Sequence, residues 1–231
     1  MGPILQAKGL TKIYTTGGIQ TPALQGVDLT IQKGEFTAIA GPSGSGKSTL
    51  LHLLGGLDRP TAGETWLGDR RTDQLDAVAL AHIRLWEIGF VFQAYNLIPV
   101  LTALENAAFV LELQGRPRRE REAKAMAALE ALGMAAYAHR RPNQLSGGQQ
   151  QRVAIARALA AEPQVILADE PTANLDSQTG RALIELMKRL NREQGVTFVF
   201  STHDARLLEH VTRIVRLEDG RVVSDERGPG A

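Results

Sequence analysis

The sequence contains no cysteine, and this absence excludes disulfides and thiolate metal sites. No apolar run approaches the roughly 20 residues that a membrane-spanning helix needs. The N-terminal stretch MGPILQAKGLTKIY also has no apolar core of signal-peptide length. We therefore expect a chain that is soluble by itself and suited to the cytosol, so that any membrane role comes through a partner.

The sequence also lacks an excess of one charge, because it has 26 Lys and Arg and 25 Asp and Glu, which gives a net charge of +1. A nucleic-acid-binding domain usually carries a basic excess, so the balance argues against a nucleic-acid partner. The 231 residues are enough for one large domain, or a domain plus a subdomain, with a sizeable core.

Short apolar, β-branched runs without polar alternation predict strands that are covered on both faces of a largely parallel sheet. Longer amphipathic stretches between them predict helices, and the alternation predicts an α/β fold. The predicted strands are 36–40, 88–92, 165–169 and 196–202, and the predicted helices are 47–57, 118–133, 147–163 and 179–195.

The stretch from about 94 to 160 has no convincing strand, so we predict a helical subdomain there, inserted into a sheet core made of residues 1–93 and 161–231. The C-terminal residues DERGPGA are predicted to be frayed.

The stretch GPSGSGKS fits the phosphate-loop pattern G-x-x-x-x-G-K-[ST] and lies between a predicted strand and a predicted helix, as the pattern requires. Its glycines let successive backbone N–H groups point at a β-phosphate, next to the favourable dipole of a helix N-terminus. The alternative is a glycine-rich turn with a solvated lysine. The candidate binding residues are Gly41, Pro42, Ser43, Gly44, Ser45, Gly46, Lys47 for the β- and γ-phosphates, Ser48 for Mg²⁺ and Thr49 for the α-phosphate.

The run VILADEP places Asp169 and Glu170 at the carboxyl end of a buried strand, where ligands bind in open α/β sheets. We expect Asp169 to hold Mg²⁺ through a water, and Glu170 to act as general base toward a nucleophilic water or to orient it. The alternative is an acidic pair that caps the next helix.

A second anion-binding helix start follows in LSGGQQQR, where Ser146 is a predicted N-cap. Gly147 and Gly148 would let the backbone approach a phosphate closely, and Gln149 completes the motif. A chain with one phosphate loop has no evident internal use for this second site, unless two molecules face each other.

The order of these motifs, a phosphate loop, then LSGGQ, then a strand ending in DEP, resembles that of ABC ATPases over nearly the whole chain. The resemblance implies a P-loop NTPase fold with an N-terminal antiparallel β part. It also implies a head-to-tail homodimer, in which LSGGQ of one copy contacts the γ-phosphate of ATP held by the other. A bridging ligand of this kind stabilises the assembled state.

The resemblance assigns four further residues. Gln93 resembles the glutamine that senses Mg²⁺ and the attacking water, although a polar residue after a strand is unremarkable by itself. Asp176 resembles the residue of a loop that crosses the dimer interface, and it also fits a helix N-cap. His203 resembles the histidine that contacts the γ-phosphate, with a structural histidine as the alternative. Tyr14 resembles the aromatic that stacks on adenine, with a core tyrosine as the alternative.

The stretches FQAYNLIPVLTALENAAF and LADEPTANLDSQTG resemble the ABC group that serves lipoprotein release, macrolide export and cell division. Members pair with an integral membrane permease that has a large extracytoplasmic domain, which implies a peripheral location on the cytoplasmic side of the inner membrane. Tyr95, Leu97, Ile98 and Leu101 look exposed, and we expect them to be divided between a permease groove and packing of the helical subdomain.

Three alternative functions are compatible with the family resemblance. The first is ATP-driven export or extraction of a hydrophobic substrate such as a lipoprotein or drug, and the second is a regulatory ATPase that signals to cell-wall enzymes without transport. A soluble ABC protein of DNA repair or translation is disfavoured. The stretch between Lys47 and Ser146 is too short for the long coiled coil of repair members, and the chain has one such domain where translation members have two.

Overall fold

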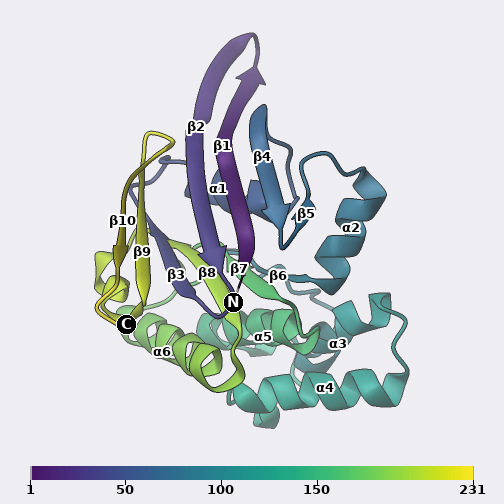
Figure 1. Ribbon diagram of the computed structural model, residues 1–231. Helices are drawn as coiled ribbons and strands as arrows, with labels where there is room; N and C mark the ends of the chain where they lie inside the picture. Colours follow the sequence, from purple (N-terminus) through teal and green to yellow (C-terminus); the bar gives the residue numbers. More distant parts are fainter. Residues whose placement is uncertain (1, 231) are drawn as a thin grey trace.

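A computed structural model describes residues 2–230 and shows two sheets with helices packed around them (Figure 1). The larger sheet has the strand order β10-β9-β3-β8-β7-β6, and it is parallel except for the antiparallel pair β9 and β10. This arrangement confirms the predicted α/β fold. The strands are β3 (Phe36–Ala40), β6 (Ile88–Val91), β7 (Val165–Ala168), β8 (Thr197–Thr202), β9 (Arg213–Glu218) and β10 (Arg221–Arg227).

Every residue of β3, β7 and β8 is buried, which explains why these strands read as continuous apolar runs in the sequence. Phe36 of β3 packs against Phe198 and Phe200 of β8, with ring centroids 5.8 and 5.4 Å apart. Because β3, β6, β7 and β8 are parallel, their carboxyl ends lie at one edge of the sheet. The predicted site residues follow these strand ends.

The N-terminal part forms a separate antiparallel sheet with the strand order β2-β1-β4-β5, as the family resemblance implied. The long hairpin of β1 and β2 extends beyond the body of the molecule at the top of Figure 1, and Ile19 beside its turn is 72% exposed. The strands are β1 (Pro3–Thr16), β2 (Ile19–Gln32), β4 (Ala62–Leu67) and β5 (Arg70–Arg71).

The helices cover both faces of the larger sheet. Helix α1 packs in the apolar cluster between the two sheets, whereas α3, α4, α5 and α6 cover the opposite face (Figure 1). The α-helices are α1 (Lys47–Leu54), α2 (Ala77–Trp86), α3 (Ala103–Leu113), α4 (Arg118–Ala131), α5 (Gly147–Ala160) and α6 (Ser177–Gln194), and the short 3-10 helices are η1 (Ala135–Tyr137), η2 (Pro142–Gln144) and η3 (Ala205–His210).

Between β6 and β7, a range that the structure describes in full, every regular element is a helix. The apolar cluster under these helices is shared with the sheet, because Leu111 of α3 and Leu129 of α4 belong to the same buried cluster as Phe36 and Phe200. The division into a core and a helical subdomain stays a prediction.

The prediction that residues 225–231 are frayed is wrong for residues 225–227, which complete β10. Asp225, Glu226 and Arg227 pair with β9, and the guanidinium of Arg213 binds the Asp225 carboxylate at 2.6 Å. A ladder of backbone hydrogen bonds with a cross-strand ion pair orders this part of the tail. Ala231 lies outside the described residues.

Candidate nucleotide site

The phosphate loop connects the end of β3 to the start of α1, as its sequence context predicted. Gly41 is required by close packing, since a Cβ there would lie 2.1 Å from the Leu217 carbonyl oxygen. The loop lines a cleft of about 460 Å³. Its lining residues are Ala23, Ser43, Gly44, Gly46, Lys47, Ser48, Thr49, Gln93, Glu170 and His203.

Lys47 lies almost completely inside this cleft, with 5% of its side chain exposed. Its ammonium donates to the backbone carbonyls of Gly41 (2.9 Å) and Pro42 (2.8 Å) and lies 3.6 Å from Oε1 of Glu170. The positive charge is therefore held at the mouth of the loop by acceptors that phosphate oxygens can replace.

Ser48 and Asp169 present two oxygen ligands side by side. The Ser48 hydroxyl donates to Oδ1 of Asp169 at 2.8 Å, and the Ser201 hydroxyl donates to the same oxygen at 2.7 Å. Hydroxyl, carboxylate and amide oxygens are the donors that Mg²⁺ prefers, usually together with waters and substrate phosphates. Residues 2–230 contain no group of three or more His, Cys, Asp or Glu that could hold a metal.

Glu170 has an unusual backbone conformation and is held by hydrogen bonds of its backbone and its side chain. Its φ of 46° lies in the left-handed region, which is strained for a residue with a side chain. Its backbone N–H donates to the Ser201 hydroxyl at 2.8 Å, and its Oε2 lies 2.7 Å from Nδ1 of His203. The carboxylate therefore points into the cleft next to Lys47.

Gln93 is exposed and follows β6 after one intervening residue. Its carbonyl oxygen accepts a hydrogen bond from the side-chain amide of Asn174 at 2.9 Å. The loop beyond it is held by Arg157 of α5, whose guanidinium donates to the carbonyl oxygens of Tyr95 (3.0 Å) and Asn96 (2.5 Å). Arg157, Asn174 and Ser201 give no sign of these contacts in the sequence, because the groups that they bind lie far away along the chain.

The four apolar side chains after Gln93 are less exposed than the sequence suggests, and their division between a permease groove and packing stays a prediction. Tyr95, Leu97, Ile98 and Leu101 are all partly buried, and Leu97 packs against the main core cluster. Val100 is the exposed apolar residue of this segment, at 71%. The segment turns inward because two successive left-handed residues follow Gln93.

Tyr14 lies at the edge of this region, 39% exposed, and it does not line the cleft. Its hydroxyl donates to Oδ2 of Asp58 at 2.9 Å, and the Lys12 ammonium lies 4.8 Å from its ring centroid. Burial and the hydrogen bond to Asp58 both raise the pKa of the Tyr14 hydroxyl. The side chain is thus anchored at the antiparallel sheet.

The start of α5 has the capping geometry that the sequence predicted. The Ser146 hydroxyl accepts from the N–H of Gln149 (3.3 Å), and the Gln149 side chain accepts from the N–H of Ser146 (2.9 Å), which forms a capping box. Gly148 also serves packing, because a Cβ there would lie 2.5 Å from a methyl group of Thr179, while Gly147 lies beside the Tyr95 hydroxyl. None of the residues 146–149 lines the cleft of the same chain.

Asp176 is the N-cap of α6, and its carboxylate accepts from the N–H groups of Gln178 and Thr179 at 3.0 Å. The N-cap interpretation is thereby confirmed. Hydrogen bonds from Thr179, from its side chain first and then its N–H, lower the pKa of the Asp176 carboxyl. Its role at a dimer interface stays a prediction.

The fold and the cleft define a P-loop nucleoside triphosphatase. Residues 24–173 match the ABC transporter family. The chain belongs to this family and is one of its ATPases.

Three relatives illustrate the similarity. The lipoprotein-releasing system ATP-binding protein LolD of Anaeromyxobacter dehalogenans is 50% identical, over 96% of this chain and 94% of that protein. The macrolide export ATP-binding/permease protein MacB 2 of Aeromonas hydrophila is 47% identical, over 99% of this chain and 35% of that protein. A dimeric post-hydrolysis structure of the cassette MJ0796 from Methanocaldococcus jannaschii, bound to ADP and Pi, is 48% identical with a TM-score of 0.89, covering 96% of this chain and 98% of that one.

Proposed function

We propose that two copies of this chain enclose ATP between the phosphate loop of one copy and the start of α5 of the other. The observation that carries the proposal is the position of Ser146, whose capped helix start lies outside the cleft of its own chain. The first-turn N–H groups of a helix favour an anion, so this site suits the γ-phosphate of a nucleotide on a partner copy. The dimeric cassette structures of MJ0796, at 48% identity, support this arrangement.

Within each ATP site, Lys47 exchanges its contacts with the loop carbonyls for the β- and γ-phosphates. Bound Mg²⁺ would be held by Ser48 and Gln93 directly and by Asp169 through a water, and it would supply positive charge against the phosphates. Glu170 accepts a proton from the attacking water or orients it. His203 lies 2.7 Å from this carboxylate and would contact the γ-phosphate of the bound nucleotide. Thr49, Asp176 and Tyr14 complete the proposed site, with Tyr14 against adenine.

We further propose that this ATPase drives an integral membrane permease with a large extracytoplasmic domain. The names of its relatives support this assignment, since LolD belongs to a lipoprotein-releasing system and MacB 2 is both ATP-binding protein and permease. No helix within residues 2–230 is long and apolar enough to cross a membrane. The chain would then be peripheral, on the cytoplasmic side of the inner membrane, and its cargo a hydrophobic substrate such as a lipoprotein or drug.

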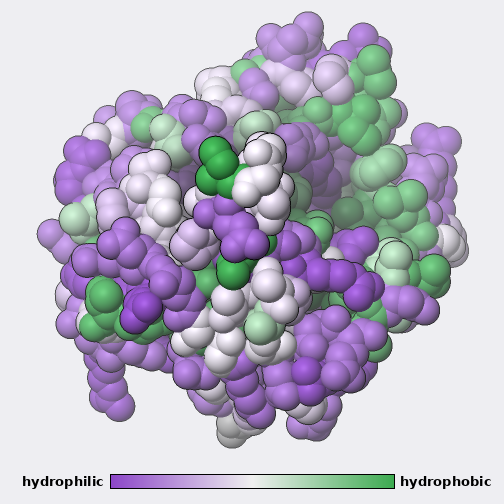
Figure 2. Space-filling view, turned by 90° about the horizontal axis from the view of Figure 1, so that it is seen from above, coloured by the Kyte–Doolittle hydropathy of each residue, from purple (hydrophilic) through white to green (hydrophobic). Residues whose placement is uncertain are grey.

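The permease would dock on the side that carries α2 and α3. Seen from above, apolar side chains gather on that side of the molecule (Figure 2). Val78 of α2, Val100 and Leu113 at the end of α3 are 79%, 71% and 58% exposed. Exposed apolar patches of this kind favour contact with another protein.

The test is to isolate the Glu170→Gln variant, with ATP and Mg²⁺, from gently solubilised native membranes and to identify its partners by mass spectrometry. The Lys47→Ala variant is the matched control, because it should fail to retain ATP. Recovery of a permease with a large extracytoplasmic domain, in the Glu170→Gln sample above the control, is the expected result. A soluble homodimer alone, while other membrane complexes survive, contradicts the permease. Copurified cell-wall enzymes would favour the signalling function.

A further inference from the structure

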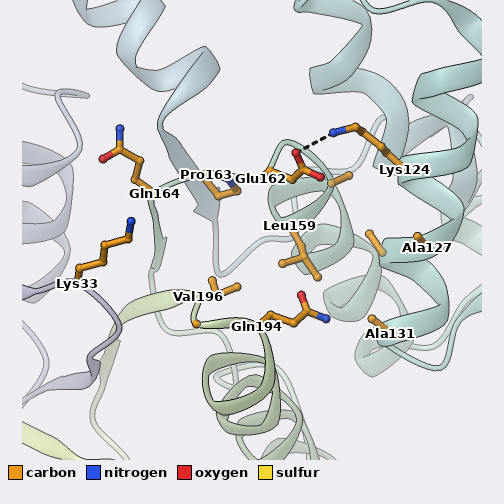
Figure 3. A pocket seen from close by; sticks show the side chains of 13 residues that line it. Lys33, Lys124, Ala127, Ala131, Leu159, Glu162, Pro163, Gln164, Gln194 and Val196 are labelled. Atoms are coloured by element: carbon orange, nitrogen blue, oxygen red, sulfur yellow. Dashed lines mark hydrogen bonds and ion pairs between the residues drawn. The ribbon is translucent and has the colours of Figure 1, made fainter. Parts of the chain in front are cut away.

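Two clefts lie outside the nucleotide site. They differ in how many of their polar side chains already form ion pairs or hydrogen bonds within the chain. The cleft between α4, the end of α5 and the end of α6 is drawn in Figure 3, with Leu159 and Val196 among its apolar lining. Its Lys124 pairs with Glu162 at 2.7 Å, and the Gln164 amide donates to Glu87. Lys124, Glu162 and Gln164 are thus already paired within the chain.

The second cleft, which we call the basic cleft, lies where the end of α4 meets α5 and α6 and has a volume of about 660 Å³. Volumes of this size are typical of small-molecule sites. Four cations and one carboxylate contribute to its lining: Arg152, Lys188, Arg189, Arg192 and Glu185. The local excess of positive charge contrasts with the net charge of +1 for the whole chain.

The cations of the basic cleft are poorly neutralised. Glu185 is already bound to Nδ1 of His210, and Arg192 approaches only Glu193, at 3.9 Å. Among residues 2–230, Arg152, Lys188 and Arg189 have no carboxylate within 4.0 Å. Cations gathered in a concave surface focus the electrostatic field and favour an anion.

Two of the guanidinium groups are also held in place. Arg152 donates to the carbonyl oxygen of Leu132 at 3.3 Å, and Arg189 donates to that of Ala131 at 3.1 Å, both at the end of α4. Each group has five N–H donors, so several remain for a ligand. Their fixed orientation lowers the entropic cost of binding. Gly133, beside Arg152, leaves space where a side chain would stand.

We propose that the basic cleft binds an anion that carries two or more phosphate groups, separately from the nucleotide cleft. Guanidinium groups match phosphate oxygens in pairs, and Arg152 on α5 and Lys188 on α6 both line the cleft, so an anion with several phosphate groups suits it better than a single phosphate. Helix α5 begins after Ser146, and α6 begins after Asp176. A bound anion would therefore connect the two helices that follow these two candidate site residues.

The experiment titrates tripolyphosphate into the full chain by calorimetry, with saturating ADP to occupy the phosphate loop. The decisive pair of variants is Lys188→Glu and Arg181→Glu. Both change one exposed or partly exposed cation of α6, and neither side chain makes a hydrogen bond or ion pair within the described residues, but only Lys188 lines the basic cleft.

We expect Lys188→Glu to weaken tripolyphosphate binding by roughly tenfold or more, and Arg181→Glu to leave it nearly unchanged. Binding should also weaken as salt rises. Equal affinity of wild type and Lys188→Glu, or equal losses in both variants, would overturn the proposal. Arg192→Glu serves as a second cleft variant if Lys188→Glu does not fold. Because binding is read directly, this outcome is independent of ATP-driven dimerisation.

Discussion

Nδ1 of His203 lies 2.7 Å from Oε2 of Glu170, although the two residues are 33 positions apart in the chain. The other carboxylate oxygen of Glu170 lies 3.6 Å from the Lys47 ammonium. One partly buried carboxylate, with 12% of its side chain exposed, therefore connects the phosphate loop, the end of β7 and the end of β8. This contact places a cation, a carboxylate and a histidine within one cleft.

Replacing Glu170 by Gln should retain ATP binding and lower kcat by roughly 10²- to 10⁴-fold, because the amide cannot accept a proton from water. Steady-state ATPase assays and nucleotide titrations measure the two effects separately. The exposed Glu193→Gln is the matched control and should be as active as wild type. Unchanged turnover of Glu170→Gln would rule out its assignment as general base.

Replacing Ser146 by Arg should abolish ATP-dependent dimerisation while the phosphate loop of the same chain still binds ATP. The bulk and charge would occupy the place where the partner's γ-phosphate is proposed to lie. Light scattering of the hydrolysis-deficient Glu170→Gln chain, with and without ATP, reads the monomer and dimer populations.

Two controls separate this effect from loss of the helix cap. Ser146→Ala removes the hydrogen bond to Gln149, at a cost of about 1 kcal/mol, without adding bulk. Ala136→Arg adds the same side chain at an exposed position of η1. Dimers formed by the Ser146→Arg chain would contradict the proposed role of α5.

Arg157→Met should slow ATP turnover more than it destabilises the fold. Its guanidinium holds the carbonyl oxygens of Tyr95 and Asn96, which follow Gln93, and burial lowers the pKa of this group. Removing the cation forfeits two charge-assisted hydrogen bonds but also relieves a desolvation cost, so the net loss of stability should stay below about 3 kcal/mol. Thermal unfolding and kcat, measured together, check this; a fall in Tm with unchanged kcat would deny the positioning role.

Tyr14→Ala should weaken ATP binding by roughly 5- to 150-fold if the ring stacks on adenine, since base stacking contributes about 1–3 kcal/mol. Tyr14→Phe keeps the ring and loses only the hydrogen bond to Asp58, so its affinity should stay near that of wild type. Competition between GTP and ATP adds a second readout. Because stacking tolerates both bases, GTP should compete with ATP for the wild-type site. If both variants bind ATP equally, the ring does not contact the base.

The parts of the fold that were predictable are those encoded locally. The phosphate loop, the buried strands and the N-caps Ser146 and Asp176 each depend on a few adjacent residues, and the structure contains all of them. Strand β10 was missed because its residues are all exposed or only partly buried and include few apolar side chains. The strand is ordered because it pairs with β9, and this pairing cannot be read from a polar sequence alone.

The missed site residues share a different cause. Arg157 lies in a helix pattern that gives no sign of its backbone partners 61 and 62 positions away. The sequence marks Gly148 as a candidate for phosphate binding but does not show that a side chain there would also clash with Thr179, because that constraint arises only when α5 and α6 meet. Tertiary contacts between distant segments, not local propensity, decide both positions.

Asp176 should make the stability of the fold depend on pH. Hydrogen bonds from Thr179 and Gln178 hold the pKa of its carboxyl below the ordinary value of 3.8 in the folded chain. Its contribution is therefore fully present above the unfolded pKa and is lost as the pH falls through the lower, folded value. The Asp176→Asn variant still caps the helix but does not titrate. Urea unfolding of both chains between pH 7 and about pH 3 should show a steeper loss for the wild type than for Asp176→Asn; parallel curves would mean that Asp176 has the same pKa in both states.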